Sequence, residues 1–338
     1  MAPFLLEYYM ETSIFDHEAF SLSSLITAYN TSTVFEDDVL KMFDVESVES
    51  RTVHLIKSGS TLQVLMPGEI GNNPNVDSPD SEEGVPVTLI RYPFENKVLP
   101  KDLERIGSLK DKKIKARELA VVVKQRMGRH RDNHRYTALF TCYTALKGII
   151  KDKKGNEKVN LFTLLGVKQK KLDFKLGTKT TDIPQMLQAY AKQTKQIAKS
   201  LGHSTLKGID VRWGQSMIER LLAHDSVKEF YGDEEHAKLR VKFADDPSSI
   251  NMCGIRFVTD EADEVAEEGA GYPVGVHGLW AMLRAPADVM SGSSANKREC
   301  HITKEPLRHD EGLEIRSRSI YLPICRAPQL LCALYSSD

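Results

Sequence analysis

One stretch of the sequence limits the possible folds more than any other. From Ile114 to Leu146 the chain contains no proline and a single glycine, Gly128. An imperfect apolar stripe runs through it at helical spacing, with a strongly polar middle. The stripe comprises Ile114, Leu119, Val122, Arg126, Met127, Ala138, Leu139, Cys142 and Ala145. At 1.5 Å per residue such a helix spans roughly 50 Å, and Gly148 marks its end. We therefore expect a strut that crosses a thin, flat subunit.

Shorter elements are expected on both sides of the strut. Residues 149–150 and 159–162 flank a Gly-Asn turn, which is typical of a hairpin. A second helix is predicted from Ile183 to Leu201, with Asp182 as its N-cap and Pro184 in the first turn. Residues 1–50 alternate short apolar clusters with polar spacers. This pattern favours an arm with short helices that docks on a larger body.

Between these parts the sequence predicts a projecting loop. Apolar residues alternate from Val53 to Met66, a polar and turn-rich stretch covers residues 67–84, and strand-like residues return at 85–90. A structureless excursion of this length is uncommon inside a compact domain. We expect its tip to contact an adjacent subunit, through Asn72, Asn73, Asp77, Asp80, Glu82 and Glu83. The alternative is a surface insertion that contacts nothing.

The remainder has an α/β pattern. A strand at 209–211 is expected to lead into a helix from about 216 to 230, followed by strands at 239–243 and 253–258. A glycine-rich stretch covers residues 269–275. The C-terminal residues alternate from 312 to 320 and become apolar at 330–334, which predicts a strand pair closing on an earlier sheet.

Composition excludes several classes of protein. The 46 Lys and Arg residues nearly balance the 47 Asp and Glu residues, so the chain as a whole does not attract nucleic acid or an anionic membrane. The five cysteines are odd in number and form no C-x-x-C pair, which favours reduced thiols in core positions over zinc ligands. No apolar run approaches the roughly 20 residues of a membrane span. We expect a soluble protein with no membrane partner.

A search for catalytic or metal-binding motifs gives no site. His130 and His134 are four residues apart on one helical face, but their neighbours are cationic and the H-E-x-x-H pattern is absent. We expect these histidines on a solvated polar face. Gly269, Gly271 and Gly275 do not match G-x-G-x-x-G. The carboxylate pairs at 245–246 and 267–268 are adjacent rather than opposed. We predict no catalytic residue, no cofactor and no metal.

Four segments carry a resemblance to a known family. They are residues 33–43 before the strand at 51–65, the basic stretch 110–117 leading into Glu118-Leu119-Ala120, the end of the strut at 146–150 before the hairpin, and residues 318–334. Their order and spacing resemble the lambda-type major capsid proteins of tailed phages, the major capsid protein E family. The similarity extends over most of the chain.

The resemblance implies an α+β fold of the Hong Kong 97-like phage capsid type. Its parts would be an N-terminal arm (1–50), an extended β-hairpin loop (51–92), a peripheral domain (93–204 plus 309–338) with a long spine helix (114–147), and an axial α/β domain (205–308). The hairpin at 149–162 would be the projecting β-element of the peripheral domain. The chain has no room for an N-terminal scaffolding domain, so assembly would need a separate scaffold protein.

The resemblance also implies a function. The protein would self-assemble into hexamers and pentamers of an icosahedral shell around double-stranded DNA, with a portal and a decoration protein as further partners. It would be found in the virion after assembly in the host cytoplasm. Two alternatives stay open. A non-specific nucleic-acid-binding protein should show aromatic interleaving or a reader module, and an α/β enzyme centred on 205–308 should show convergent polar groups in a pocket.

Basic residues crowd the strut although the chain is neutral. The ten are Lys110, Lys112, Lys113, Lys115, Arg117, Lys124, Arg126, Arg129, Arg131 and Arg135. We single out Lys124, Arg126, Arg129, Arg131 and Arg135 as an inner-surface or inter-subunit basic cluster. One interpretation is a solvated face with ion pairs to Asp111, Glu118 and Asp132. The other is a surface that meets DNA phosphates or acidic loops of neighbours. Under both, replacing Arg126, Arg129 and Arg131 with Gln should spare folding.

Overall fold

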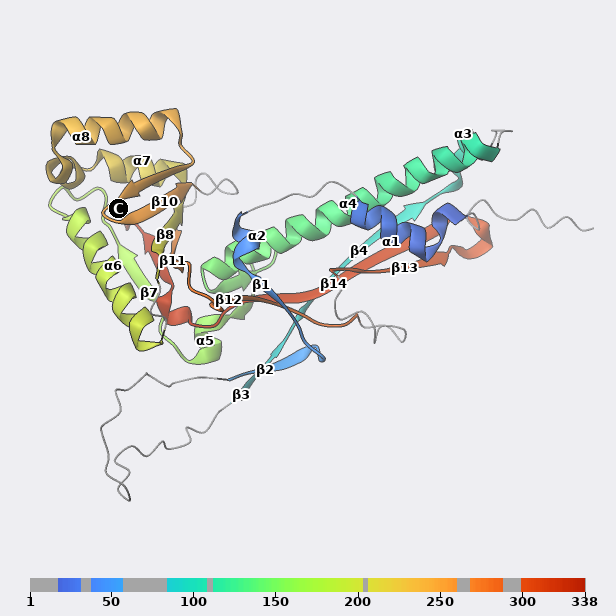
Figure 1. Ribbon diagram of the computed structural model, residues 1–338, viewed down its shortest axis with the longest axis horizontal. Coiled ribbons are helices and arrows are strands. Elements are labelled where there is room, and N and C mark those ends of the chain that lie inside the picture. Colours follow the sequence, from blue (N-terminus) through green and yellow to red (C-terminus); the bar gives the residue numbers. More distant parts are fainter. Residues whose placement is uncertain are drawn as a thin grey trace, which may run out of the picture.

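The long helix dominates the computed structural model. The structure describes residues 18–31, 38–56, 84–107, 112–202, 206–259, 268–287 and 299–337. Helix α4 (Lys112–Leu146) runs along a narrow sheet and ends beside a lobe that holds a second sheet and three helices, so the molecule is elongated (Figure 1). The predicted strut is confirmed. Helix α4 ends before Gly148, whose φ of +75° favours glycine and whose added Cβ would collide with the Phe162 ring.

The narrow sheet is organised around β14 (Leu313–Cys325), the longest strand described. Strands β4 (Ile90–Val98), β12 (Trp280–Arg284) and β13 (His301–Pro306) pair with it, all antiparallel, and β1 (Asp44–Ser47) adds to β12 in parallel. Most of β14 is buried, because α4 lies along it. Strands are confirmed at both C-terminal stretches, but they do not form the expected pair, because β14 joins this sheet and the later strand, β15 (Cys332–Tyr335), joins the sheet of the lobe.

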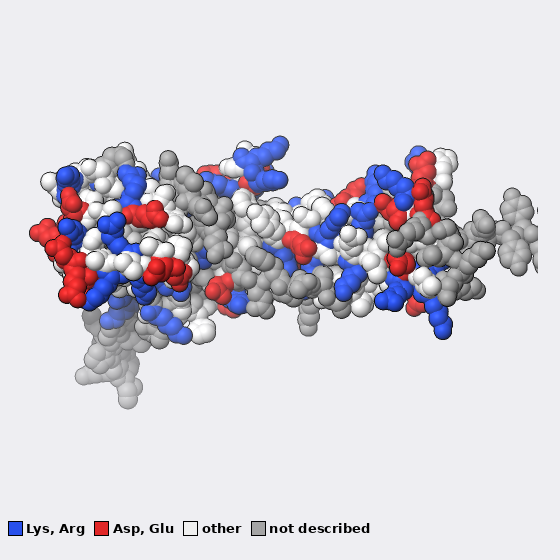
Figure 2. Space-filling view, turned by 90° about the horizontal axis from the view of Figure 1, so that it is seen from above, with Lys and Arg blue, Asp and Glu red and all other residues white. Residues whose placement is uncertain are grey.

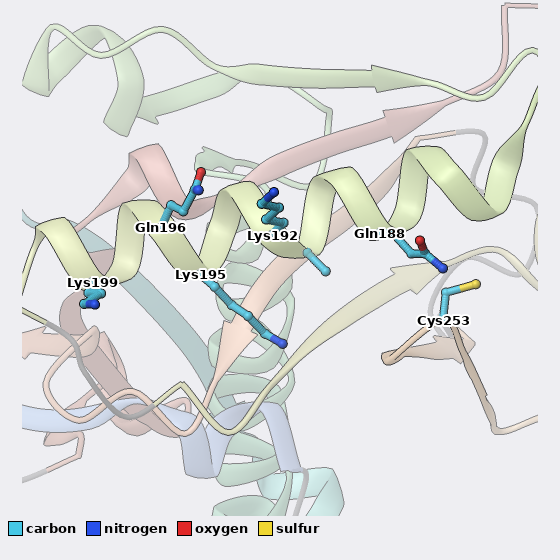
Figure 3. A pocket seen from close by; sticks show the side chains of 7 residues that line it. Gln188, Lys192, Lys195, Gln196, Lys199 and Cys253 are labelled. Carbon is cyan, nitrogen blue, oxygen red and sulfur yellow. The ribbon is translucent and has the colours of Figure 1, made fainter.

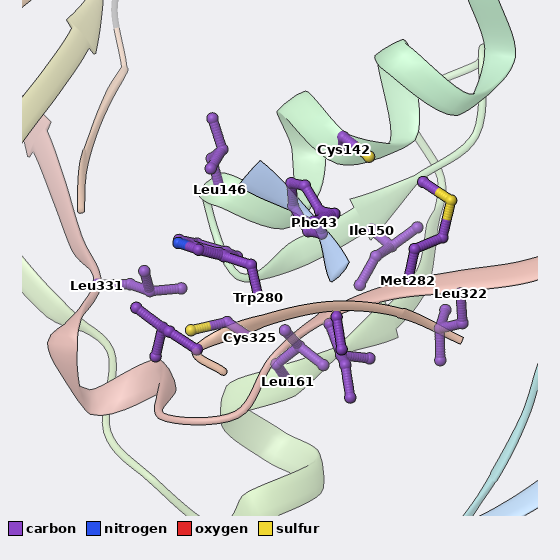
Figure 4. Packing of buried hydrophobic residues seen from close by; sticks show 14 of the residues in the cluster. Phe43, Cys142, Leu146, Ile150, Leu161, Trp280, Met282, Leu322, Cys325 and Leu331 are labelled. Carbon is purple, nitrogen blue, oxygen red and sulfur yellow. The ribbon is translucent and has the colours of Figure 1, made fainter. Parts of the chain in front are cut away.

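The inner end of α4 packs into the largest hydrophobic cluster. Figure 4 shows Phe43, Cys142, Leu146 and Trp280 converging there, with the Phe43 and Trp280 ring centroids 5.2 Å apart. The cluster joins α2 (Asp38–Met42), the hairpin β5 (Ile149–Lys151) and β6 (Glu157–Asn160), α5 (Leu161–Leu165) and η5 (Pro328–Leu330).

The outer half of α4 is covered by η2 (Glu18–Phe20), α1 (Leu22–Thr31) and α3 (Pro100–Gly107). A short η4 (Arg308–Asp310) precedes β14.

The lobe contains a six-stranded sheet in the order β7-β15-β11-β8-β10-β9. Its strands are β7 (Lys170–Asp173), β8 (Gly208–Trp213), β9 (Ser249–Met252), β10 (Ile255–Thr259), β11 (Gly269–Val274) and β15 (Cys332–Tyr335). Helices α6 (Ile183–Ser200), α7 (Gln215–Ala223) and α8 (Asp225–Asp245) share one hydrophobic cluster with this sheet. The glycine-rich stretch is strand β11, where a Cβ at Gly271 would strike the side chains of Tyr190 and Leu334.

Two predictions for the lobe were wrong. The helix expected from about 216 to 230 is two helices, because the chain leaves helical geometry at His224, which has a ψ of 138°. The strand expected at 239–243 lies inside α8. Within α8, His236 and Phe243 are buried seven residues apart, which is a helical spacing. The apolar residues of 239–243 alternate as in a strand over only five positions, which are too few to separate the two spacings.

The range 205–308, expected as one axial domain, does not coincide with the lobe. It supplies β8, β9, β10 and β11 to the six-stranded sheet, but β12 and β13 to the narrow sheet. Strands β7 and β15 and helix α6 enter the lobe from outside that range. The chain therefore crosses between the two parts several times, which sequence order alone does not reveal.

The flanks of the expected loop form a separate two-stranded sheet. Strand β2 (Thr52–Ile56) pairs antiparallel with β3 (Gly84–Thr88), and this hairpin stands away from both larger sheets (Figure 1). Val87 is buried against the main cluster, and Val53 and Leu55 are partly buried there. The tip of the predicted loop lies outside the described residues.

Candidate functional site

The polar middle of α4 faces its own subunit. His130 and His134 are 0% and 4% exposed, and they bond to serine hydroxyls on β14. His130 Nδ1 lies 2.6 Å from Ser317 Oγ, and His134 lies between Ser317 and Ser319, with ring nitrogens 2.8 and 2.7 Å from the two hydroxyls. The expectation of a solvated face for these histidines was wrong. Residues four apart on the helix meet residues two apart on the strand, which sequence spacing alone cannot show.

Burial sets the protonation of this pair. Loss of hydration lowers the pKa of His130 to about 4, with His134 as a further cause, and burial lowers the pKa of His134 to about 4. Both rings are therefore neutral at pH 7. The Phe94 ring meets His130 edge-on, with centroids 4.7 Å apart. Within the described part of the chain, no group of three His, Cys, Asp or Glu side chains is arranged to hold a metal ion.

Three of the five singled-out cations hold α4 to neighbouring elements of the same subunit. The Arg131 guanidinium is 6% exposed and donates to the carbonyl oxygens of Tyr29 and Asn30, at 3.0 and 2.7 Å. These carbonyls belong to the last turn of α1, where a cation is favourable. Arg126 pairs with Asp102 of α3 at 3.0 Å. Arg135 pairs with Glu299 at 3.4 Å.

The other two, Lys124 and Arg129, are exposed on α4. Lys113 and Arg117 are also exposed, whereas Lys110 and Asp111 lie outside the described residues. In the view from above, blue and red side chains alternate along the narrow part of the molecule, without one continuous basic face (Figure 2). The structure thus separates the cluster into internal contacts and a small exposed remainder. Whether that remainder faces DNA or another subunit stays a prediction.

The acidic and amide residues expected at the inter-subunit loop all lie outside the described residues. They are Asn72, Asn73, Asp77, Asp80, Glu82 and Glu83. The structure gives their anchor instead. On the β2–β3 hairpin, Thr52 and Thr88 are both exposed and their hydroxyl oxygens lie 3.2 Å apart across the strands.

The lobe offers an open groove on α6 rather than a catalytic pocket. Gln188, Ala191, Lys192, Lys195, Gln196, Lys199 and Cys253 line it (Figure 3). Burial raises the pKa of the Cys253 thiol, and the nearby Tyr231 hydroxyl lies 3.7 Å from its sulfur. The lining residues therefore include no nucleophile with an adjacent base.

The ionic pair in the lobe sheet is also structural. Asp210, 5% exposed on β8, is bonded by the guanidinium of Arg256 on the adjacent strand β10. The two side chains join neighbouring strands and do not open into the α6 groove. Among the described residues, no helix is both long enough and apolar enough to cross a membrane.

Comparison with protein families gives a match over residues 21–335, to the phage major capsid protein E family. The chain belongs to this family. The resemblance stated from the sequence is confirmed, and the protein has the structural role of a capsid shell component, found in the virion. The family is a structural one and not a family of enzymes. A comparison with curated proteins gives no significant match.

A solved structure supports the fold. The putative capsid protein of a prophage of Escherichia coli CFT073 is 10% identical, with 93% of this chain and 98% of that chain covered and a TM-score of 0.51. This likeness shows that the major capsid protein has the mixed α+β fold of a phage capsid protein. A phage-related protein of Bordetella bronchiseptica RB50 is 12% identical, with coverages of 93% and 96% and a TM-score of 0.46. A chain of the mature capsid of bacteriophage PhiM1 is 12% identical, with coverages of 91% and 89% and a TM-score of 0.48.

Sequence reasoning missed the partners of the basic and histidine side chains. Ser317 and Ser319 alternate with Arg318 on β14, and this alternation was available as a sign that two hydroxyls face one side. No comparable signal marked Tyr29 and Asn30, which meet Arg131 from about a hundred residues away in the chain.

Proposed function

We propose that this major capsid protein assembles into hexamers and pentamers of an icosahedral shell that encloses double-stranded DNA. The observation that carries the proposal is the β2–β3 hairpin, which stands apart from both larger sheets. The hairpin packs on the main cluster only through one side, by Val87, Val53 and Leu55, and a two-stranded hairpin gains little stability by itself. Its exposed Thr52, His54 and Thr88 and the polar segment beyond it are therefore suited to contact an adjacent subunit.

The proposed shell assigns a place to each part. The narrow sheet and α4 would form the peripheral region with its spine helix, residues 18–31 an arm, and the lobe the axial region around capsomer centres. This arrangement is consistent with the Hong Kong 97-like fold. The exposed Lys124 and Arg129 would touch phosphates without sequence specificity. A separate scaffold protein, a portal and a decoration protein complete the proposed partners, with assembly in the host cytoplasm.

The test compares purified wild-type protein with a variant lacking residues 72–83, by negative-stain microscopy and thermal melting. We expect closed shells from the wild type when it is supplied with its scaffold protein. The deletion should keep the melting transition and give free subunits or open pieces, because the lost contacts are between subunits. Normal shells from the deletion variant would contradict the proposed role of the loop. A wild-type protein that stays monomeric with its scaffold would contradict shell assembly itself.

A further inference from the structure

The exposed face of α6 carries positive charge without any negative charge on the helix. Gln188, Lys192, Lys195 and Lys199 recur at spacings of four, three and four residues, which places them on one face. All four are exposed, and no Asp or Glu occurs from Ile183 to Ser200. None of the three lysines pairs with an acid among the described residues. Figure 3 shows these side chains along the groove, with Gln188 nearest Cys253.

The groove has an apolar floor beside the lysines. Ala191 and the half-buried Cys253 line it together with the aliphatic stems of the lysine side chains. Asp182 caps the start of α6, and its carboxylate already accepts from the Gln185 backbone N–H at 3.0 Å. A ligand for this surface therefore needs several negative charges and a few small apolar groups.

A segment that leaves and re-enters the sheet of the lobe has that composition. Residues 260–268 read Asp-Glu-Ala-Asp-Glu-Val-Ala-Glu-Glu, with acids interspersed with Ala262, Val265 and Ala266 and with no basic residue. Opposite charges gathered in separate segments of a nearly neutral chain favour pairing between them and fix its register. Charge complementarity thus favours the acidic segment as the occupant of the groove.

The topology of the lobe separates this segment from the groove of its own subunit. The acidic segment starts after Thr259, at the carboxyl end of β10, and returns at Gly269, where β11 begins. Cys253 lies in the turn before β10, at the opposite edge of the sheet. Helix α6 ends shortly before β8 begins, so Lys199 also belongs to that opposite edge.

Distance reinforces this separation. Strand β11 covers Gly269–Val274, roughly 17 Å between the two edges. The ten residue steps from Thr259 to Gly269 reach at most about 17 Å outward and back. Within its own subunit the segment could therefore bring only its tip to the opposite edge, with no residues left to lie along the groove. A neighbouring copy is therefore better placed to supply the acidic segment than the same chain. We propose that the α6 groove of each subunit binds residues 260–268 of an adjacent subunit.

The contact is head to tail, because the two surfaces differ, and repetition of such a contact about a capsomer axis closes a ring. This inference rests on the proposed self-assembly and adds to it a specific electrostatic contact between lobes. Because the groove is exposed, its ion pairs are screened by salt. The contact should therefore weaken as salt concentration rises.

A cross-linking experiment on assembled particles tests the contact directly. An Ala262→Cys variant places a thiol in the acidic segment, opposite the natural Cys253 of the groove. Mild oxidation of assembled shells should give a ladder of dimers and larger species on non-reducing gels. The matched control Ala237→Cys, on the exposed face of α8, should give no ladder. Adding Cys253→Ser to Ala262→Cys should abolish it. Shells without a ladder, or with a disulfide within one subunit, would overturn the inference while leaving shell assembly intact.

Charge reversal gives an independent readout. The Lys192→Glu, Lys195→Glu and Lys199→Glu triple variant should lower particle yield at least about tenfold, because three exposed pairs become repulsive together. Reversing Asp263, Glu264 and Glu267 to Lys in the same chain should restore the yield. The matched control reverses the exposed Lys168, Lys171 and Lys179 and should assemble normally. Normal yield with loss of retained DNA in the α6 variant would show that the groove meets nucleic acid, and would overturn the inference. If the wild type itself fails to assemble, the proposed function fails first.

Discussion

Helices α4 and α6 are both rich in lysine and arginine, yet they use these residues in opposite ways. On α4, Arg126, Arg131 and Arg135 reach acids or carbonyls of the same subunit. On α6, Lys192, Lys195 and Lys199 reach none that the structure describes. The difference follows from burial, since α4 is covered by α1, α3 and the narrow sheet while the outer face of α6 is open. A local excess of positive charge therefore does not by itself indicate a binding surface.

The largest effect in this comparison should come from pH, through His130 and His134. Their pKa is about 4 in the folded state against 6.5 in the unfolded chain, so the unfolded chain takes up protons first as pH falls. Stability should be unaffected by them above pH 6.5 and be lost progressively between pH 6.5 and 4, by on the order of 3 kcal/mol per histidine at most. Denaturant unfolding across this range measures the loss.

The control for the pH experiment compares the slope of stability against pH between the wild type and two variants. A His130→Gln, His134→Gln variant should start less stable at pH 7 but lose less stability toward pH 4. The exposed His54→Gln change should leave the slope as in the wild type. Parallel curves for the wild type and the double variant would show that the buried pair does not control acid sensitivity.

The second effect concerns Arg131. Replacing it with Gln leaves the Tyr29 and Asn30 carbonyls without their charged donor, at a cost of about 2–3 kcal/mol. This revises the expectation that the triple Gln replacement spares folding, because Arg131 is 6% exposed rather than solvated. Thermal melting of Arg131→Gln should show a clear fall. The matched Arg129→Gln variant, exposed on the same helix, should melt within error of the wild type.

A third, smaller effect is expected in the lobe. A Cβ at Gly271 would lie 2.5 Å from the Tyr190 hydroxyl oxygen and 3.0 Å from Leu334 Cδ1, so Gly271→Ala forces α6 or β15 to shift. We expect a loss of about 1–3 kcal/mol, as for overpacked cores. Gly128→Ala on α4 has open space around the new methyl group and should be neutral or slightly stabilising. Equal melting of the two variants would contradict the packing described for β11.

The smallest effect on stability should come from Lys124 and Arg129. Replacing both with Gln should change the free energy of unfolding by less than about 0.5 kcal/mol, since both side chains are exposed. If they face packaged DNA, retention of DNA in particles should fall more steeply with salt than in the wild type. Unchanged retention at every salt concentration would leave them as solvated side chains.

The sequence predicted the elements that local signals control. Helix α4 follows from a stretch without proline, and α6 follows from the Asp182 cap with Pro184 in its first turn. The hairpin at β5 and β6 follows from its Gly-Asn turn. Of the five cysteines, all are free and all but Cys253 are buried, as expected of small apolar side chains.

Long-range contacts decided the rest. His130 was expected in solvent because its neighbours in sequence are cationic, but β14 covers it from a distant part of the chain. The strand predicted at 239–243 failed because five residues do not separate helical from alternating spacing. The lobe takes β7 and β15 from outside 205–308, a crossing that no local pattern encodes.

The most direct test of the account is a cryo-electron microscopy reconstruction of shells assembled from the wild-type protein and its scaffold. The account predicts closed icosahedral shells of hexamers and pentamers, in which residues 72–83 lie on an adjacent subunit and Arg131 remains inside its own. It also predicts density from residues 260–268 of one subunit on α6 of the next. Shells whose loops fold back on their own subunit would contradict the account, as would a protein that forms no shell.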